Sequence, residues 1–224
     1  MRVAVVTAYG KESASQLRRC VDAVAAQTYA VTHLLVADGA PQDWVDRVDG
    51  LRHLHLDRPR PGFPLAPLAI GAARAAGEQF DALAVVNPQD VPDPDYVQEC
   101  LATAEREHSL HFVLVEAHDA EPSPPAGGLF VLRRGFPALP GLALIPAPLA
   151  GLGTELILER FRILDYHGVA TPRPLFTPAP PSRPTLAEIR AWWDTLQPDQ
   201  QRLIEANVGG TMSFTGPPAP DGDD

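Results

Sequence analysis

The sequence has few of the features that mark secreted, membrane or nucleic-acid-binding proteins. Its two cysteines, Cys20 and Cys100, lie far apart among 224 residues, which favours free thiols in a reducing compartment over a disulfide framework. No apolar run approaches the roughly 20 residues of a membrane helix, and the N-terminus lacks the apolar length of a signal peptide. A formal net charge of −10 argues against a duplex-DNA binder. These absences predict a cytoplasmic protein with no membrane span and no nucleic-acid partner.

Apolar runs alternate with helical patterns in the first half of the chain. Strands are predicted at 2–7, 33–37, 51–56, 83–86 and 111–115. Ser13 and Gln16 form a capping box before a helical pattern, and further helices are predicted at about 65–78 and 93–107. This alternation predicts an α/β fold, with a mostly parallel central sheet flanked by helices.

The second half of the chain is less regular. The sequence predicts a strand at 129–132, a loop at 137–153, a helix at 154–167, a proline-rich stretch at 172–184 and a helix at 185–207. Residues 216–224 contain Pro, Gly, Asp and one Ala, without a large apolar side chain, and are predicted to be disordered. We therefore expect one domain over 1–180, a C-terminal helical extension over 181–210 and a disordered tail over 211–224.

Six short segments, in order along the first hundred residues, resemble glycosyltransferase family 2. They are Thr7-Ala8-Tyr9-Gly10, Cys20 to Tyr29 with its Gln27-Thr28-Tyr29 ending, Val36 to Ala40, Ala72 to Gly77, Val86 to Asp90 and Pro94-Asp95-Tyr96. The resemblance implies a GT-A fold, with a nucleotide-sugar half over 1–100 and an acceptor half over 101–180. It also implies an inverting transferase of the hexosyltransferase type, with a nucleotide-sugar donor such as a UDP-sugar. It leaves the acceptor unnamed.

Several polar residues follow predicted strands, where ligands of open α/β sheets bind. Tyr9 suits a base, Asp38 can accept from a uracil-like imide N–H, and Arg74 can neutralise a phosphate charge. With Thr7, these residues are expected to hold the nucleotide. The alternatives are ordinary ones: Asp38 as a turn residue before Gly39, Tyr9 as a strand-end aromatic, and Arg74 on a solvated helix face.

The segment Asn87-Pro88-Gln89-Asp90 stands where the family has its acidic metal-binding step. Mn²⁺ or Mg²⁺ prefers oxygen ligands with negative charge, and Asn87 and Gln89 carry amides there. Asp90 is the surviving carboxylate, so it is the predicted metal ligand, with Asn87 and Gln89 beside the diphosphate. The alternative interpretation makes Asp90 a turn residue and the reaction independent of a metal.

The resemblance also implies a catalytic base in the second half. Glu155 opens the predicted helix at 154–167, where the family places a carboxylate, and Glu159 lies one turn further on the same face. The alternative is an acidic residue that merely favours a helix N-terminus.

Two other functions remain open on the sequence alone. A GT-A-fold binding or scaffold protein without transfer activity would fit the amide-substituted segment, and nucleotidyl transfer is a weaker alternative. Trp192 and Trp193 are expected to bury the last helix, or else to mark a protein partner or dimer interface. His53 and His55 share one strand face without a visible third ligand, so a solvated face is predicted there.

Overall fold

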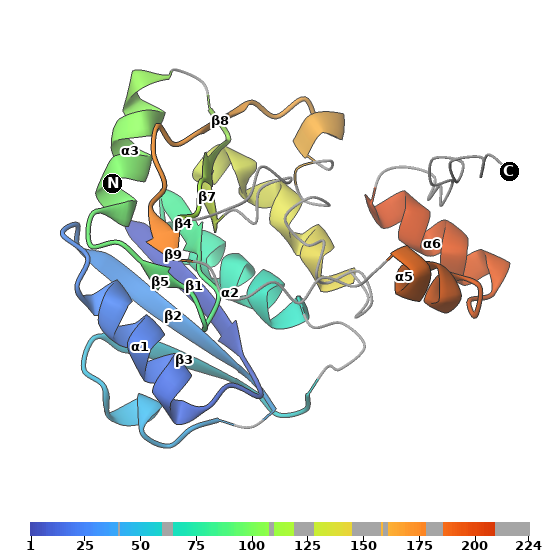
Figure 1. The fold of residues 1–224 in the computed structure, drawn as a ribbon, viewed down its shortest axis with the longest axis horizontal. Coiled ribbons are helices and arrows are strands. Elements are labelled where there is room, and N and C mark those ends of the chain that lie inside the picture. The colour runs from blue at the N-terminus through green and yellow to red at the C-terminus, as the bar shows by residue number, and fades with distance from the viewer. Residues whose placement is uncertain are drawn as a thin grey trace, which may run out of the picture.

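A seven-stranded mixed sheet forms the centre of the molecule (Figure 1). This computed structural model describes residues 1–39, 41–59, 65–107, 110–118, 128–144, 158, 161–177 and 186–208. The strands are β1 (Val3–Tyr9), β2 (Val31–Asp38), β3 (Leu51–Leu56), β4 (Ala82–Val85), β6 (Phe112–Val115), β7 (Gly128–Leu132) and β8 (Gly168–Ala170). Their order is β3-β2-β1-β4-β7-β6-β8. β3, β2, β1 and β4 are parallel, and β7 runs antiparallel to β4 and β6.

Alternate side chains of β1 point to opposite faces of the sheet, and both faces are buried. Ala4 and Val6 pack on one face, and Val3 and Val5 pack on the other. A strand buried on both sides needs apolar residues at nearly every position, which explains the continuous apolar run in the sequence. The predicted α/β architecture is therefore confirmed, with β7 as the antiparallel exception.

Helices α1 (Ala14–Ala25) and α3 (Tyr96–Arg106) cover one face of the sheet (Figure 1). The Ser13 hydroxyl accepts from the Gln16 N–H, and the Gln16 side chain accepts from the Ser13 N–H, so the predicted capping box is present. Cys20 of α1 and Cys100 of α3 are buried free thiols, as the sequence predicts. Burial raises the pKa of Cys20 to about 12, so this thiol is not a nucleophile near neutral pH.

Helix α2 (Ala66–Gly77) covers the other face and contacts β1 very closely. A Cβ atom on Gly71 would lie 2.5 Å from Val6 Cγ1 and 3.0 Å from Val36 Cγ2. The small residues of this helix, Gly71, Ala72 and Ala75, are buried for that reason. Close packing therefore accounts for the small residues on the buried face of α2, whereas Ala73, Ala76 and Gly77 are exposed.

Two predictions for the second half are wrong in detail. The stretch predicted as a loop from 137 begins with 3₁₀ turns, η2 (Arg133–Leu144), which pack against α2. Pro137 and Pro140 lack the N–H donors of an α-helix, so tighter turns form in its place. The predicted helix at 185–207 is two helices, α5 (Leu186–Trp193) and α6 (Pro198–Val208).

The C-terminal helices pack on the body of the molecule through their apolar side chains. Trp193 and Ile189 are buried, and Trp192 and Ile204 pack against the cluster that includes Leu139 of η2. This arrangement satisfies the packing interpretation of the tryptophans, and a partner at these helices stays a prediction. The tail at 211–224 lies outside the described residues, as do residues 154–157, 159 and 160 of the helix predicted at 154–167. The division at 180 also stays a prediction.

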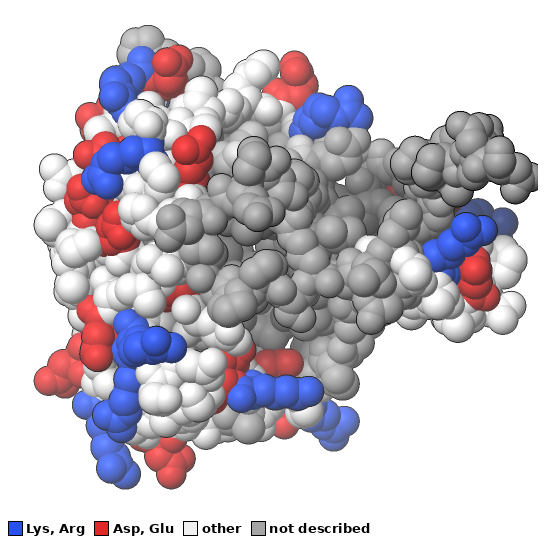
Figure 2. Space-filling model, in the orientation of Figure 1, with Lys and Arg blue, Asp and Glu red and all other residues white. Residues whose placement is uncertain are grey.

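Acidic and basic side chains are interspersed on the face shown in Figure 2, without a continuous basic stripe among the residues described there. Among the described residues, no helix is both long and apolar enough to cross a membrane.

Candidate functional site

Three parallel strands end at the same edge of the sheet and bring sequence-distant polar residues to it. In the register of β1 and β2, Tyr9 lies beside Ala37, so Tyr9 and Asp38 end neighbouring strands. β4 lies on the other side of β1, and the Val86 N–H donates to the Val6 carbonyl at 3.1 Å. The segment from Asn87 therefore leaves the sheet at this edge. The structure thus places Tyr9, Asp38 and the 87–90 segment as the strand pattern predicts.

Asp38 is half-buried at the end of β2, next to Gly10 of the neighbouring loop. A Cβ atom on Gly10 would lie 3.6 Å from Asp38 Cβ, so the loop after β1 passes close by. Gly39 has a φ of +86°, and a Cβ atom there would lie 2.6 Å from Pro59 Cδ. Only glycine fits this turn without strain. The turn at Gly39 therefore ends β2 with Asp38 at the edge of the sheet.

Tyr9 does not lie open to a ligand in this structure. Its side chain is buried, its hydroxyl lies 2.8 Å from His53 Nε2, and its ring stacks on the His53 ring. The hydroxyl also accepts from the Gln42 N–H at 3.0 Å. Burial raises the pKa of the Tyr9 phenol. The role of Tyr9 here is to hold the 41–47 connection against β3, and a base-stacking role is not supported.

Thr7 is also turned inward. It is fully buried, and its hydroxyl lies 3.1 Å from His33 Nε2 on the neighbouring strand. Burial lowers the pKa of His33 to about 3, so the imidazole is neutral. The hydroxyl thus satisfies an internal polar group.

The structure does not bring Arg74 to the edge that carries Asp38. Arg74 lies in the last turn of α2, which runs antiparallel to the strands, and its Nε lies 2.5 Å from Glu78 Oε1. Glu78 also pairs with Arg52, the second residue of β3, and its carbonyl accepts from Arg2 at the start of β1. Arg74 therefore lies near the edge of the sheet where β1 and β3 begin. Asp38 lies at the opposite edge, so the structure does not support the predicted phosphate role of Arg74.

The 87–90 segment forms a turn with its polar side chains divided between surface and interior. The Asp90 N–H donates to the Asn87 carbonyl at 3.1 Å. Asn87 and Gln89 are exposed, whereas Pro88 and Asp90 are buried, with Asp90 6% exposed. The two amides therefore face solvent while the only carboxylate of the segment faces the protein.

Asp90 and Tyr96 line a small hollow next to the 87–90 turn. The other lining residues are Val85, Val86, Pro92 and Gly128, and the hollow is too tight to admit water. The Tyr96 hydroxyl is buried and has no hydrogen-bond partner among the described residues. Burial, with smaller contributions from Cys100 and Asp90, holds the pKa of Tyr96 well above its usual value.

In this arrangement, the 87–90 segment is not suited to coordinate a divalent cation that also binds the diphosphate of the donor. Such an ion prefers charged oxygen ligands that converge from the ligand-facing side. Asn87 and Gln89 bring no charge, and Asp90 is buried in a hollow with no room for a hydrated ion. We therefore derive no catalytic step through a metal at this segment.

The Gln27 segment and the Pro94-Asp95-Tyr96 segment bind one another, which sequence reasoning missed. Gln27 Nε2 donates to the Asp93 carbonyl at 2.6 Å, and Gln27 Oε1 accepts from the Val97 N–H at 3.1 Å. The Thr28 N–H donates to the Pro94 carbonyl at 2.7 Å. Asp95, the N-cap of α3, makes no side-chain cap bond, and the helix start is satisfied by Gln27 from another element. These two parts of the resemblance are therefore structural.

A short two-stranded sheet lies next to the contact between Gln27 and the start of α3. It joins β5 (Val91–Pro92) to β9 (Phe176–Thr177). Nearby, His118 Nε2 lies 3.0 Å from Asp93 Oδ2, and Arg173 pairs with Asp95. Glu155 and Glu159, the predicted bases, lie outside the described residues.

Comparison with solved structures identifies the fold. The 1–349 fragment of TarS from S. aureus matches with a TM-score of 0.65 at 12% identity, over 96% of this chain and 67% of that one. The same fragment in complex with UDP-GlcNAc matches with a TM-score of 0.66 at 11% identity, over 96% and 68%. The mannosyltransferase PcManGT from Pyrobaculum calidifontis, in complex with GDP-Man and Mn²⁺, matches with a TM-score of 0.57 at 15% identity, over 92% and 68%.

The chain therefore has the GT-A-like fold of glycosyltransferases, as the resemblance implies. It spans about two thirds of the TarS fragment and 41% of a longer TarS chain. No protein-family model matches the sequence, and no curated protein matches it.

Proposed function

We propose that the chain transfers a sugar from a nucleotide-sugar donor to an acceptor hydroxyl, with inversion at the anomeric carbon. The observation that carries this proposal is the position of Asp38, before the turn at Gly39, at the edge where β1, β2 and β4 end. In open α/β sheets this edge is the ligand-binding one. The fold shared with nucleotide-sugar-bound structures supports the same assignment.

The donor is a nucleoside diphosphate sugar, and a UDP-sugar is the first to test. A carboxylate at Asp38 can accept the imide N–H of uracil, which cytosine and adenine do not offer. A TarS structure similar to this chain holds UDP-GlcNAc. The exposed amides of Asn87 and Gln89 can donate hydrogen bonds to the diphosphate without adding negative charge beside it.

The transfer step requires a base and a leaving group. The acceptor oxygen forms a bond to the anomeric carbon as the bond from that carbon to the diphosphate oxygen breaks, and the hydroxyl proton goes to a carboxylate. We assign this base to Glu155, with Glu159 as the neighbouring candidate on the same helical face. The leaving diphosphate carries the electron pair away.

One observation favours a second function, a nucleotide-binding protein of the same fold without transfer activity. Asp90, the only carboxylate of the 87–90 segment, is buried, and the amides of Asn87 and Gln89 cannot replace its charge. A segment of this kind leaves the departing diphosphate with little charge compensation.

An assay of donor hydrolysis and transfer separates the two functions. The enzyme should turn over a UDP-sugar, and Glu155→Gln should lose a factor of about 10² or more while its donor affinity stays unchanged. Full activity in Glu155→Gln with loss in Glu159→Gln would move the base one turn along. Donor binding without turnover in the wild type, with and without Mn²⁺, would leave the binding protein as the correct assignment.

A further inference from the structure

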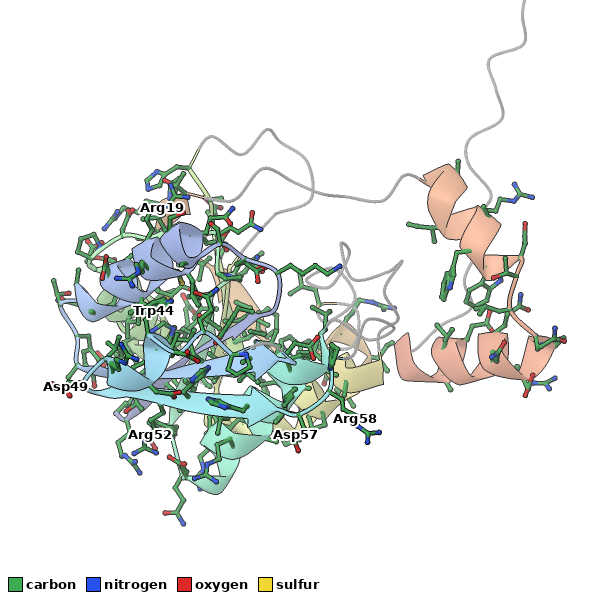
Figure 3. All side chains as sticks on the ribbon, turned by 90° about the horizontal axis from the view of Figure 1, so that it is seen from below. Arg19, Trp44, Asp49, Arg52, Asp57 and Arg58 are labelled. Atoms are coloured by element: carbon green, nitrogen blue, oxygen red, sulfur yellow. The ribbon has the colours of Figure 1, made fainter. Side chains whose placement is uncertain are left out.

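We propose that Asp46, His53 and His55 form a zinc-binding site on the outer part of the sheet, separate from the nucleotide edge. Asp46 belongs to the short 3₁₀ turn η1 (Val45–Arg47), and the two histidines belong to the edge strand β3. The alternation of a strand puts His53 and His55 on one face. Figure 3 shows that Trp44, which precedes η1, and Arg52 of β3 lie on opposite sides of this strand.

Three potential ligand atoms converge in a small space. His53 Nδ1 lies 2.8 Å from Asp46 Oδ1 and 2.8 Å from His55 Nε2, and His55 Nε2 lies 3.5 Å from Asp46 Oδ1. Within the part of the chain that the structure describes, this is the group of three whose ligand atoms all lie within 4.8 Å of one another. Two imidazoles and one carboxylate are a ligand set that zinc uses.

Protons cannot satisfy all three contacts at once. If His53 Nδ1 carries a proton, that single proton must serve both Asp46 Oδ1 and His55 Nε2. If His55 Nε2 carries it instead, His53 Nδ1 faces the Asp46 oxygen at 2.8 Å with two lone pairs opposed. If both nitrogens are protonated, two N–H groups meet at 2.8 Å. One cation between the atoms satisfies all three lone pairs together.

The size of the cluster suits zinc after a small movement. Tetrahedral Zn²⁺ with bonds of about 2.0–2.1 Å separates its ligand atoms by about 3.3–3.5 Å. The contacts of 2.8 Å must therefore open slightly. The side chains of Asp46 and His55 are 52% and 42% exposed, so they can move, whereas His53 is 4% exposed and is fixed. Three protein ligands leave the fourth position to water.

Neighbouring groups orient the fixed ligand. His53 Nε2 lies 2.8 Å from the Tyr9 hydroxyl, whose oxygen also accepts from the Gln42 N–H. A metal-bound histidine usually donates its other ring N–H to an oxygen, and Tyr9 supplies that oxygen. Zinc at this site would join the 41–47 connection to β3, and so stiffen the outer edge of the sheet.

Direct zinc titration of the full chain, carrying no histidine tag and first stripped with a chelator, tests the proposal. Calorimetry at about pH 7.5 should show one zinc per chain, and zinc should raise the melting temperature. Asp46→Asn and His55→Gln change exposed side chains, so both variants should fold, and each should weaken zinc binding by about tenfold or more. Asp49→Asn and His167→Gln, at exposed residues outside the cluster, serve as matched controls with unchanged affinity.

Three outcomes would overturn the site. The first is that the wild type binds no stoichiometric zinc. The second is that Asp46→Asn and His55→Gln bind zinc as tightly as the wild type does. The third is that zinc affinity falls in either control variant by as much as it falls in Asp46→Asn and His55→Gln, which would place the ion elsewhere. Cobalt can replace zinc as a visible probe: the absorption of a four-coordinate site should appear in the wild type and vanish in His55→Gln.

Discussion

Thr7, Tyr9 and Asp90 are polar residues near the ligand-binding edge whose side chains make contacts inside the protein. Thr7 faces His33, Tyr9 faces His53, and Asp90 lines the hollow next to its own turn. The sequence correctly places all three after or within strands. It cannot show which way each side chain points, because that depends on which helix covers which face of the sheet. At the residue scale, burial therefore decides between a ligand contact and a structural contact.

His33 should make stability depend on pH. The pKa of His33 is about 3 in the folded state and 6.5 in the unfolded state. Between these two pH values, the unfolded chain binds a proton at His33 that the folded chain does not bind. The stabilisation is complete above pH 6.5 and is lost as pH falls toward about 3. Urea unfolding from about pH 7 down to about pH 5 should show a loss of stability that approaches about 1.4 kcal/mol per pH unit at the lower pH values. His33→Gln should flatten it, and equal slopes in both proteins would contradict the assignment.

The hydroxyls of Tyr96 and Tyr9 should respond in opposite ways to removal. The Tyr96 hydroxyl is buried without a described partner, so Tyr96→Phe should leave stability unchanged or raise it by about 1 kcal/mol. Tyr9→Phe is the matched control, because it leaves the Gln42 N–H unpaired and should cost about 1–3 kcal/mol. Chemical denaturation measures both. A marked loss in Tyr96→Phe would mean that its hydroxyl has a bound partner.

At the scale of elements, periodicity predicts the regular helices and strands well and the irregular ones poorly. The runs that became β1 and β2 are mostly apolar, so the burial of these two strands is evident from the sequence. η2 was missed because Pro137 and Pro140 look like loop residues, and only its contact with α2 makes the turns stable. The third zinc ligand, Asp46, was missed because η1 reaches β3 only in the folded chain.

Two glycines of α2 should behave differently when replaced by alanine. Gly71→Ala places a Cβ atom 2.5 Å from Val6 Cγ1, and valine is too stiff to yield, so the change should cost about 1–3 kcal/mol. Gly77→Ala, at the exposed end of the same helix, meets nothing within 4 Å and should stabilise by about 0.5–1 kcal/mol. Thermal melts compare the pair. Equal effects would show that α2 does not pack on β1 as closely as described.

At the scale of the whole molecule, the sequence predicts the fold further than the site. Six short segments in the right order are enough to indicate a GT-A fold, because each segment lies at a strand end or a helix contact that the fold requires. Two of them prove structural: Gln27 joins α1 to the start of α3, and Ala72 and Ala75 are buried on α2. Resemblance therefore identifies the architecture, and does not by itself identify which side chains meet the donor.

Calorimetric titration with nucleoside diphosphates and their sugars tests the central claim most directly. We predict that one nucleotide class, with UDP first, binds one to one at the edge that carries Asp38. Asp38→Asn should weaken this affinity by about tenfold or more, since the amide cannot replace the charged acceptor. Asp22→Asn, an exposed change on α1, should leave it unchanged. If no nucleoside diphosphate or nucleotide sugar binds, or if Asp38→Asn binds as the wild type does, this edge of the sheet is not a nucleotide-sugar site.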